Sequence, residues 1–356
     1  NIPAHHAMAL FCAGTVFGRD EWRDQARSFM VRVAEEQSPN GWWAELNGPV
    51  VSYNFVYSDS LGIYYHMSGD GDVLQALERA AGYHASFTYP DGSSVETIDG
   101  RNPYHAGVHL GNPGFSHTAA GRGFLAQQHR LYLESGGKFD ADYAASMSLY
   151  GGEGEIEETP SGKDRNVFKM GDEAATLRIR PWYICVSSFV TELPDNRWGQ
   201  DRQNFLSVYH DKTGLILGGG NTKLQPLWST FTVGNTSLLS HIPGDEEPNF
   251  SPRDGLIHAP DRALYKVDEE KATLELGYGS ETGSVELVPD GDATLLLKYT
   301  TTAISGQPVE AHVTVIPHLD KSLKLSTGEE FTLGDEKFSR TGMDWIQHGG
   351  WRLEIP

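Results

Sequence analysis

The spacing of apolar residues changes part-way along the chain, and this change constrains the fold more than any other feature of the sequence. Over residues 1 to 150 the apolar residues recur at the spacing of helix faces. The stretch "DEWRDQARSFMVRVAEEQ" places Trp22, Phe29 and Val33 on one face, with Asp20 at the expected N-cap. Turn-like breaks such as SPNG, YPDG and ESGG separate this stretch from others of its kind. We therefore expect a succession of helical hairpins.

Beyond residue 165 the apolar period becomes two, as in "TLRIRPWYICVSSFV" and "GSVELVPDGDATLLLKYTT". Turn signals separate these segments at short intervals, which is typical of an antiparallel β-sandwich. Between the halves lies the acidic, glycine-rich segment "GGEGEIEETPSGKD", residues 151 to 164, which reads as a linker or an exposed hairpin. The predicted fold is α+β and multidomain, with helical hairpins over 1–150 and an antiparallel sandwich over 165–356.

Charge and composition exclude some classes of partner. The 356 residues carry a formal net charge of −20, so the protein as a whole would repel nucleic acid phosphates. An acidic substrate would need a local basic patch. No apolar run approaches the roughly 18 to 20 residues of a membrane span. Cys12 and Cys185, the only cysteines, each lie in an apolar stretch, and we expect two buried thiols in place of a disulfide.

One polar loop stands out in the helical half. The stretch "PDGSSVETIDGRNPYH", residues 90 to 105, follows a predicted helix and combines acidic, basic, amide and aromatic side chains. Such a loop either lines a substrate cleft or solvates a turn, and its density of hydrogen-bonding groups favours the cleft. Arg101 would supply the local positive charge that an acidic protein needs, and Asp99 would hold Arg101 in place.

Three stretches of the first half resemble a known family. They are "AMALFCAGTVFGRDEWRDQA", "VAEEQSPNGWWAELNGPVVSYNFVY" and "ALERAAGYHASFTYPDGSSVETIDG". Their order and spacing are similar to those of the heparinase II/III-like polysaccharide lyases, over roughly residues 1 to 115. The resemblance implies part of an (α/α) toroid joined to an antiparallel β-sandwich. It also implies an acidic polysaccharide as substrate, no cofactor and a secreted or periplasmic location. A start at Asn1 is consistent with a cleaved export signal or with a fragment of a longer protein.

A lyase of this kind removes the C5 proton of a uronate and expels the C4 oxygen, so its site needs a carboxylate neutraliser, a base and an acid. A tyrosine beside a cation can serve as both base and acid. The resemblance places this tyrosine at Tyr53, with Tyr57, one helical turn on, in reserve. The catalytic candidates are Tyr53, His105, Asn1 and Arg101. The candidates for substrate binding are Trp42, Trp43, Glu45, Asn54, Tyr57, Asn102, Tyr104, His117, Trp198, Gln200, Arg202 and Asn204.

Each candidate has a simpler reading. Tyr53 belongs to an aromatic-rich segment and could be a core residue, and the paired Trp42 and Trp43 could pack a turn rather than stack on sugar rings. His105 and His109 are four residues apart but lack an HExxH-like partner, so no metal site is predicted. The cluster around Arg202 could bind a uronate carboxylate or form a solvated edge strand.

Two other functions stay open. A glycoside hydrolase on a related helical toroid would use two carboxylates, such as Glu45 and Asp99. A non-catalytic carbohydrate-binding relative would keep the architecture without the chemistry. Asn54 favours this second alternative, because the family has a histidine after its catalytic tyrosine.

Overall fold

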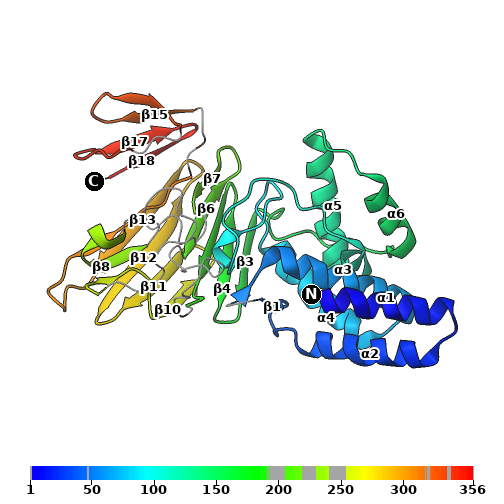
Figure 1. Ribbon diagram of the computed structural model, residues 1–356. Coiled ribbons are helices and arrows are strands. Elements are labelled where there is room, and N and C mark those ends of the chain that lie inside the picture. The colour runs from blue at the N-terminus through cyan, green and yellow to red at the C-terminus, as the bar shows by residue number, and fades with distance from the viewer. Residues whose placement is uncertain are drawn as a thin grey trace.

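The computed structural model describes residues 2–45, 48–190, 192, 205–218, 230–239, 254–316, 318, 321–334 and 338–355. Within these residues, α-helices occupy the first part of the chain and antiparallel β-sheets the second (Figure 1). The chain is therefore α+β, as the change in apolar spacing predicts. The last helix ends at Tyr150, and the first strand of the main sheet begins at Arg165.

The helical part is built from hairpins of neighbouring helices. Its helices are α1 (Ile2–Val16), α2 (Asp20–Glu35), α3 (Val51–Ser68), α4 (Gly71–Ser86), α5 (Ala119–Glu134) and α6 (Ala141–Tyr150), with 3₁₀ turns η1 (Glu96–Ile98) and η2 (Pro113–His117). The predicted N-cap of α2 is wrong by one residue, because Arg19 holds the capping position. Asp20 lies inside the first turn, where its carboxylate pairs with the Arg23 guanidinium.

Helix α3 runs through the centre of the helical part and approaches η2 closely. A Cβ atom on Gly62 would lie 2.2 Å from Gly114 Cα, and one on Gly114 would lie 2.1 Å from Ser58 O. Both positions therefore require glycine, since a side chain would force the two backbones apart. Leu61 and Tyr64, on the same stretch of α3, are fully buried in the core that α1, α2 and α4 complete.

The strands form several antiparallel sheets. The main sheet has the order β3 (Arg165–Met170), β4 (Ala174–Ile179), β5 (Trp182–Ser187), β6 (Leu206–His210), β7 (Gly214–Leu217). A second has the order β10 (Arg262–Val267), β11 (Ala272–Tyr278), β12 (Glu281–Asp290), β13 (Thr294–Thr301). Smaller sheets are β1–β2 (Ala44–Glu45, Gly48–Pro49), β14–β8–β9 (Val309–Ala311, Phe231–Gly234, Leu256–Ile257) and β16–β15–β17–β18 (Glu330–Thr332, Ser322–Leu325, Trp345–His348, Trp351–Glu354). A further 3₁₀ turn, η3, spans Thr236–Leu239.

The main sheet β3–β7 is the middle layer of the molecule (Figure 1). Apolar side chains on one of its faces, among them Tyr183 and Tyr209, share a core with Phe87 and Ile98 of the helical part. Its other face shares a core with strands β10–β12. Neighbouring residues along each strand therefore face opposite cores, so these strands read as nearly continuous apolar runs. The arrangement is compatible with a toroid and a sandwich, which remain predictions.

The segment 151–164 contains no strand, so it is not a hairpin, and it lies along α5. Glu157 N donates to Ala119 O at 3.1 Å, and Arg122 Nε donates to Glu155 O at 2.7 Å. Ser161 is buried and accepts a 3.0 Å hydrogen bond from Gln127 Nε2. These contacts attach the connection between the two halves to the helical surface.

Both cysteines are free thiols, as expected. Cys185 is buried, whereas Cys12 on α1 is only half-buried.

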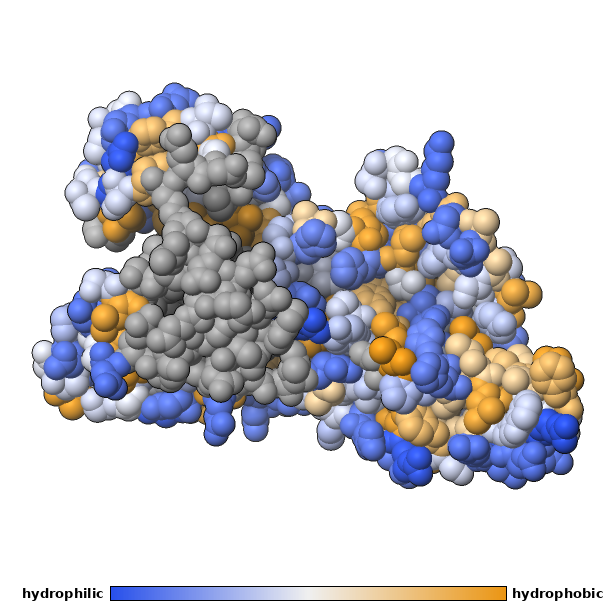
Figure 2. Space-filling model, in the orientation of Figure 1, coloured by the Kyte–Doolittle hydropathy of each residue, from blue (hydrophilic) through white to orange (hydrophobic). Residues whose placement is uncertain are grey.

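Apolar side chains gather at the end of the helical part where α1 meets α2 (Figure 2). Val16 and Phe17 there are 75% and 69% exposed. No helix among the described residues is long and apolar enough to cross a membrane.

Candidate functional site

The loop that follows η1 is attached to the start of α3 by one buried carboxylate. Asp99 is 3% exposed, and its Oδ2 accepts a 2.8 Å hydrogen bond from Val51 N, the first residue of α3. Its Oδ1 accepts from the backbone N–H groups of Arg101 (2.8 Å) and Asn102 (2.7 Å). A carboxylate at this position satisfies an unpaired N–H group of the helix and interacts favourably with the helix dipole. The loop is thereby fixed against the first turn of α3.

This attachment brings Tyr53 and Arg101 together. Arg101 Nη1 donates to the Tyr53 hydroxyl oxygen at 2.6 Å, and the guanidinium carbon lies 5.3 Å from the centre of the tyrosine ring. Both side chains are half-buried. Beside them, Asn102 Nδ2 donates to Ser52 Oγ at 3.2 Å. We call Tyr53 and Arg101 the tyrosine–arginine pair. The two residues are 48 positions apart in the sequence, and their contact places a phenol and a cation together at a partly accessible point.

Other phenols near the loop have acidic neighbours instead of a cation. Tyr89 is buried and donates to Glu96 Oε2 at 2.9 Å, and burial together with the Glu96 charge raises the pKa of Tyr89 well above its usual value. Burial, followed by the charge of Asp91, raises the pKa of Tyr104 to about 12. Both phenols stay protonated at neutral pH, and Tyr89 acts as a hydrogen-bond donor to Glu96.

Tyr57, the reserve candidate, lies in an environment of the same kind. Its hydroxyl donates to Glu45 Oε1 at 3.4 Å, and burial and the Glu45 charge raise the pKa of Tyr57 to about 12. Its ring stacks on Trp43 at 4.9 Å between centroids, with 16° between the planes. Tyr57 and Glu45 therefore form a packed unit next to the β1–β2 hairpin.

Two of the expected substrate-binding residues are inside the core. Trp43 is 3% exposed and Asn54 is fully buried. Asn54 Oδ1 accepts from Trp43 N at 2.7 Å, while its Nδ2 donates to the carbonyl oxygens of Trp43 (3.1 Å) and Val50 (3.0 Å). The Asn54 side chain thus connects α3 to the backbone of the segment that precedes it, at Trp43 and Val50. The expectation that Trp43 and Asn54 contact substrate is wrong for this arrangement, because neither reaches a surface.

Trp42 lies at the junction of the helices and the main sheet. Its Nε1 donates to Glu173 Oε2 at 2.9 Å, and Asn40 Nδ2 donates to the same oxygen at 2.8 Å. The ring is half-buried and meets Phe189 edge-on at 5.8 Å. Sequence reasoning missed Glu173, and no local pattern would have revealed it, since it follows Trp42 by 131 residues.

The two candidate histidines, His105 and His117, have different surroundings. His105 is exposed, and its proximity adds to burial in lowering the pKa of His109. His117 ends η2 and meets Tyr65 edge-on at 5.0 Å, and burial and the His66 charge lower the pKa of His117. Tyr65 follows Tyr53 by three helical turns, about 18 Å along α3. The structure therefore places His117 away from the tyrosine–arginine pair.

Five candidates lie outside the described residues. They are Asn1, Trp198, Gln200, Arg202 and Asn204. Among the residues that the structure describes, no group of three or more His, Cys, Asp or Glu side chains could hold a metal ion.

Comparison with known proteins adds no family assignment. No protein-family model matches this chain, and no curated protein matches its sequence. The chemistry of the site is therefore argued from its residues alone. At the half-buried tyrosine–arginine pair the phenol can exchange a proton, and the guanidinium can bind an anionic group.

Proposed function

We propose that the protein is a polysaccharide lyase that cleaves a uronate-containing polysaccharide by β-elimination. One observation carries the proposal, the 2.6 Å hydrogen bond from Arg101 Nη1 to the Tyr53 hydroxyl oxygen. It joins the two groups that such a reaction needs, a proton-transferring phenol and a cation for the sugar carboxylate.

In the proposed reaction Tyr53, as its phenolate, takes the proton from C5 of the uronate. The C5–H electron pair forms the C4–C5 double bond, and the C4–O bond to the leaving sugar breaks. Tyr53 then returns the proton to the leaving oxygen. The products are an unsaturated uronate at one new end and a free hydroxyl group at the other.

Arg101 has two tasks in this scheme. A phenol oxygen that loses its proton keeps a charge-assisted hydrogen bond from the guanidinium. A guanidinium also carries five N–H donors in a planar fork, so one group can contact a phenol and a carboxylate together. Neutralising the carboxylate makes the adjacent C5 proton easier to remove. Exposed His105 follows on the same loop, where it can approach the sugar.

Environment favours Tyr53 over the other tyrosines of this region. Tyr57 and Tyr104 have pKa values of about 12 because they are buried beside carboxylates. A negative neighbour opposes both the loss of their protons and the approach of an anionic sugar. Tyr53 has a guanidinium at 2.6 Å instead.

The layering supports the finer architecture that the proposal implies. The α1–α6 hairpins would form part of an (α/α) toroid, and the sheets β3–β7 and β10–β13, which share one core, would form the sandwich. The proposed location is secreted or periplasmic, where polysaccharides are encountered.

A glycoside hydrolase is less well supported. It would need two carboxylates flanking the bond that breaks. Asp99 is 3% exposed and already accepts hydrogen bonds from the N–H groups of Val51, Arg101 and Asn102. A carboxylate in this position holds the loop and does not face a substrate.

The test is an ultraviolet absorbance assay for unsaturated products against a panel of uronate polymers. We expect the native protein to be active and Tyr53→Phe to lose about 100-fold or more, the contribution of a general acid–base group. Tyr132→Phe serves as the matched control. It also removes a tyrosine hydroxyl, but one in the last turn of α5 that donates to the exposed Lys138 carbonyl oxygen.

Four results would contradict the proposal. Equal activity of Tyr53→Phe and the native protein would remove the tyrosine from the chemistry, and selective loss in Tyr57→Phe would move the role to Tyr57. New reducing ends without absorbance would indicate hydrolysis. Binding to a polymer without any cleavage would identify a carbohydrate-binding protein.

A further inference from the structure

The sheet β16–β15–β17–β18, near the end of the chain, has one buried face and one polar face. It lies beyond the second large sheet, away from the helices (Figure 1). Leu325, His348 and Trp351 point to the buried side and are 2%, 1% and 9% exposed. Since successive residues of a strand face opposite sides, Lys324 and Gln347 lie on the other side, and both are exposed.

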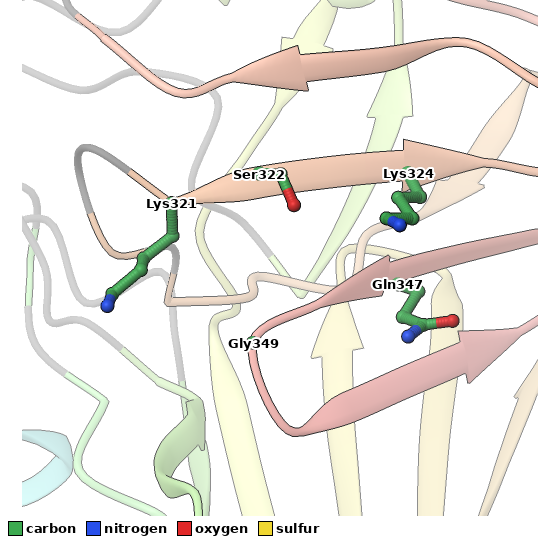
Figure 3. Close-up of a pocket in the computed structure, with 5 residues that line it drawn as sticks. All are labelled: Lys321, Ser322, Lys324, Gln347 and Gly349. Atoms are coloured by element: carbon green, nitrogen blue, oxygen red, sulfur yellow. The ribbon is translucent and has the colours of Figure 1, made fainter.

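The polar side of this sheet contains a hollow of about 280 Å³. Its lining consists of Lys321, Ser322, Lys324, Gln347 and Gly349. Figure 3 shows Ser322 and Lys324 on β15 above Gln347 on β17, with Lys321 extending beside the turn at Gly349. The volume equals the share of about nine water molecules, enough for one sugar ring but small for a larger ligand.

Cross-strand pairing aligns further polar side chains in a row next to the hollow. Lys324 pairs with Gln347 across β15 and β17, and Gln347 pairs with Arg352 across β17 and β18. Directly paired residues lie on the same face about 5 Å apart. The Arg352 guanidinium lies 4.3 Å from the centre of the Trp345 ring, which steadies it at the end of the row. Arg352 also pairs with the exposed Glu354 carboxylate at 3.0 Å. Cations, an amide and a hydroxyl thus gather on one face, with carboxylates at its edges.

The lysines of the hollow are available to an incoming anion. Lys324 Nζ lies 3.4 Å from Glu330 Oε2, and the two side chains are 49% and 52% exposed. Ion pairs this exposed are weak, so a ligand anion can replace the glutamate. Lys321 is exposed at the start of β15. In a chain of net charge −20, two ammonium groups around one hollow form a distinct positive site.

We propose that this hollow is a second carbohydrate-binding site, one that takes a carboxylate-bearing sugar. Lys321 and Lys324 contact the carboxylate, and Ser322 and Gln347 bond to the ring hydroxyl groups. The choice of an acidic sugar rests on the proposed function. The site is separate from the tyrosine–arginine pair, because it lies on the sheet β16–β15–β17–β18, away from the helices (Figure 1). It would hold a distant part of the polymer while the tyrosine–arginine pair acts on another.

Calorimetric titration of the full chain with a panel of uronate tetrasaccharides, of the galacturonate, mannuronate and glucuronate types, tests the proposal. Arg101→Gln is the host protein, since it removes the cation of the tyrosine–arginine pair and leaves the hollow intact. We expect the host to bind at least one acidic tetrasaccharide. Adding Lys321→Gln and Lys324→Gln should weaken this binding about twofold to thirtyfold, as the loss of two exposed ionic contacts predicts.

Two controls separate a built site from general charge. The pair Lys266→Gln and Lys298→Gln makes the same charge change on the exposed surface of the sheet β10–β13 and should leave binding unchanged. Carboxyl-reduced tetrasaccharides should bind markedly more weakly than the acidic ones. Raising the salt concentration should weaken binding of the acidic ones, because exposed charges are screened.

Several outcomes would overturn the proposal. They are no binding of any acidic tetrasaccharide by the host, unchanged binding after both lysines are replaced, an equal loss in the control pair, or equal binding of the reduced sugar. The lyase proposal fails on a different observation, the absence of unsaturated products from the native protein. The two proposals can therefore fail separately.

Discussion

Replacing Asp99 with asparagine should destabilise the helical part and separate the groups of the candidate site. The carboxylate is 3% exposed and accepts three backbone hydrogen bonds, at Oδ2 from Val51 and at Oδ1 from Arg101 and Asn102. Asparagine keeps the shape but has only one accepting oxygen. If that oxygen faces Arg101 and Asn102, the amide nitrogen points its hydrogens at the N–H of Val51.

The magnitude follows from these contacts. The buried N–H of Val51 loses its partner, which costs about 1–3 kcal/mol. The two remaining hydrogen bonds lose their charge assistance, about 1 kcal/mol each. The negative charge at the start of α3 disappears, which costs about 0.5 kcal/mol more. We expect Asp99→Asn to lower the free energy of unfolding of the helical part by about 4 kcal/mol.

Asp91→Asn is the matched control. Asp91 Oδ1 accepts both from Ser93 N at 2.9 Å and from Ser93 Oγ at 2.6 Å, so a single asparagine oxygen can retain both bonds. Urea unfolding followed by circular dichroism compares the two variants, and hydrogen exchange of the first turn of α3 localises the effect. Equal unfolding midpoints for the two variants, or unchanged exchange at Val51, would refute the reasoning.

Two further predictions concern the helical core. Burial lowers the pKa of His84 to about 3 from 6.5, so its stabilising contribution is complete above pH 6.5 and falls as the unfolded chain takes up a proton. Between pH 7 and 5 the native protein should therefore lose about 2 kcal/mol more than His84→Phe in urea unfolding, and an equal loss would contradict the burial argument. Gly62→Ala should destabilise by about 1–3 kcal/mol, because its Cβ would lie 2.2 Å from Gly114 Cα. Gly82→Ala, which meets nothing within 4 Å, should stabilise α4 by about 0.5–1 kcal/mol, and the same sign for both variants in thermal melts would refute the close approach.

The order of elements was readable from the sequence because helices and strands are local patterns. The segment "VSYNFVYSDSLGIYYHMSG" predicts α3 (Val51–Ser68) closely, and "GSVELVPDGDATLLLKYTT" predicts the β12–β13 hairpin with its Asp-Gly turn. The predicted cap of α2 is off by one residue, because the helix begins at Asp20 and Arg19 holds the capping position. Segment 151–164 is a connection, one of the two alternatives that the sequence left open, but its polar composition gives no sign that it packs along α5.

The candidate site was readable only in part. The charge argument indicated Arg101 and the resemblance indicated Tyr53, and the structure brings the two into contact. Burial was not readable. The resemblance predicts that Asn54, which follows Tyr53, binds substrate, but its amide is buried and hydrogen-bonds to the backbone of Trp43 and Val50. Such roles depend on where distant backbone groups lie, which no local pattern specifies.

The geometry of the tyrosine–arginine pair depends more on the loop backbone than on the two side chains. Asp99 fixes the N–H groups of Arg101 and Asn102 and the start of α3 at once, so the loop can hold Arg101 close to Tyr53 before any ligand arrives. A guanidinium held in this way loses little rotamer freedom when a sugar carboxylate binds. Arg101→Gln should accordingly remove the chemistry at a smaller cost in stability than Asp99→Asn, which should reduce both. Comparing these two variants therefore separates the residue that would act on the substrate from the residue that positions it.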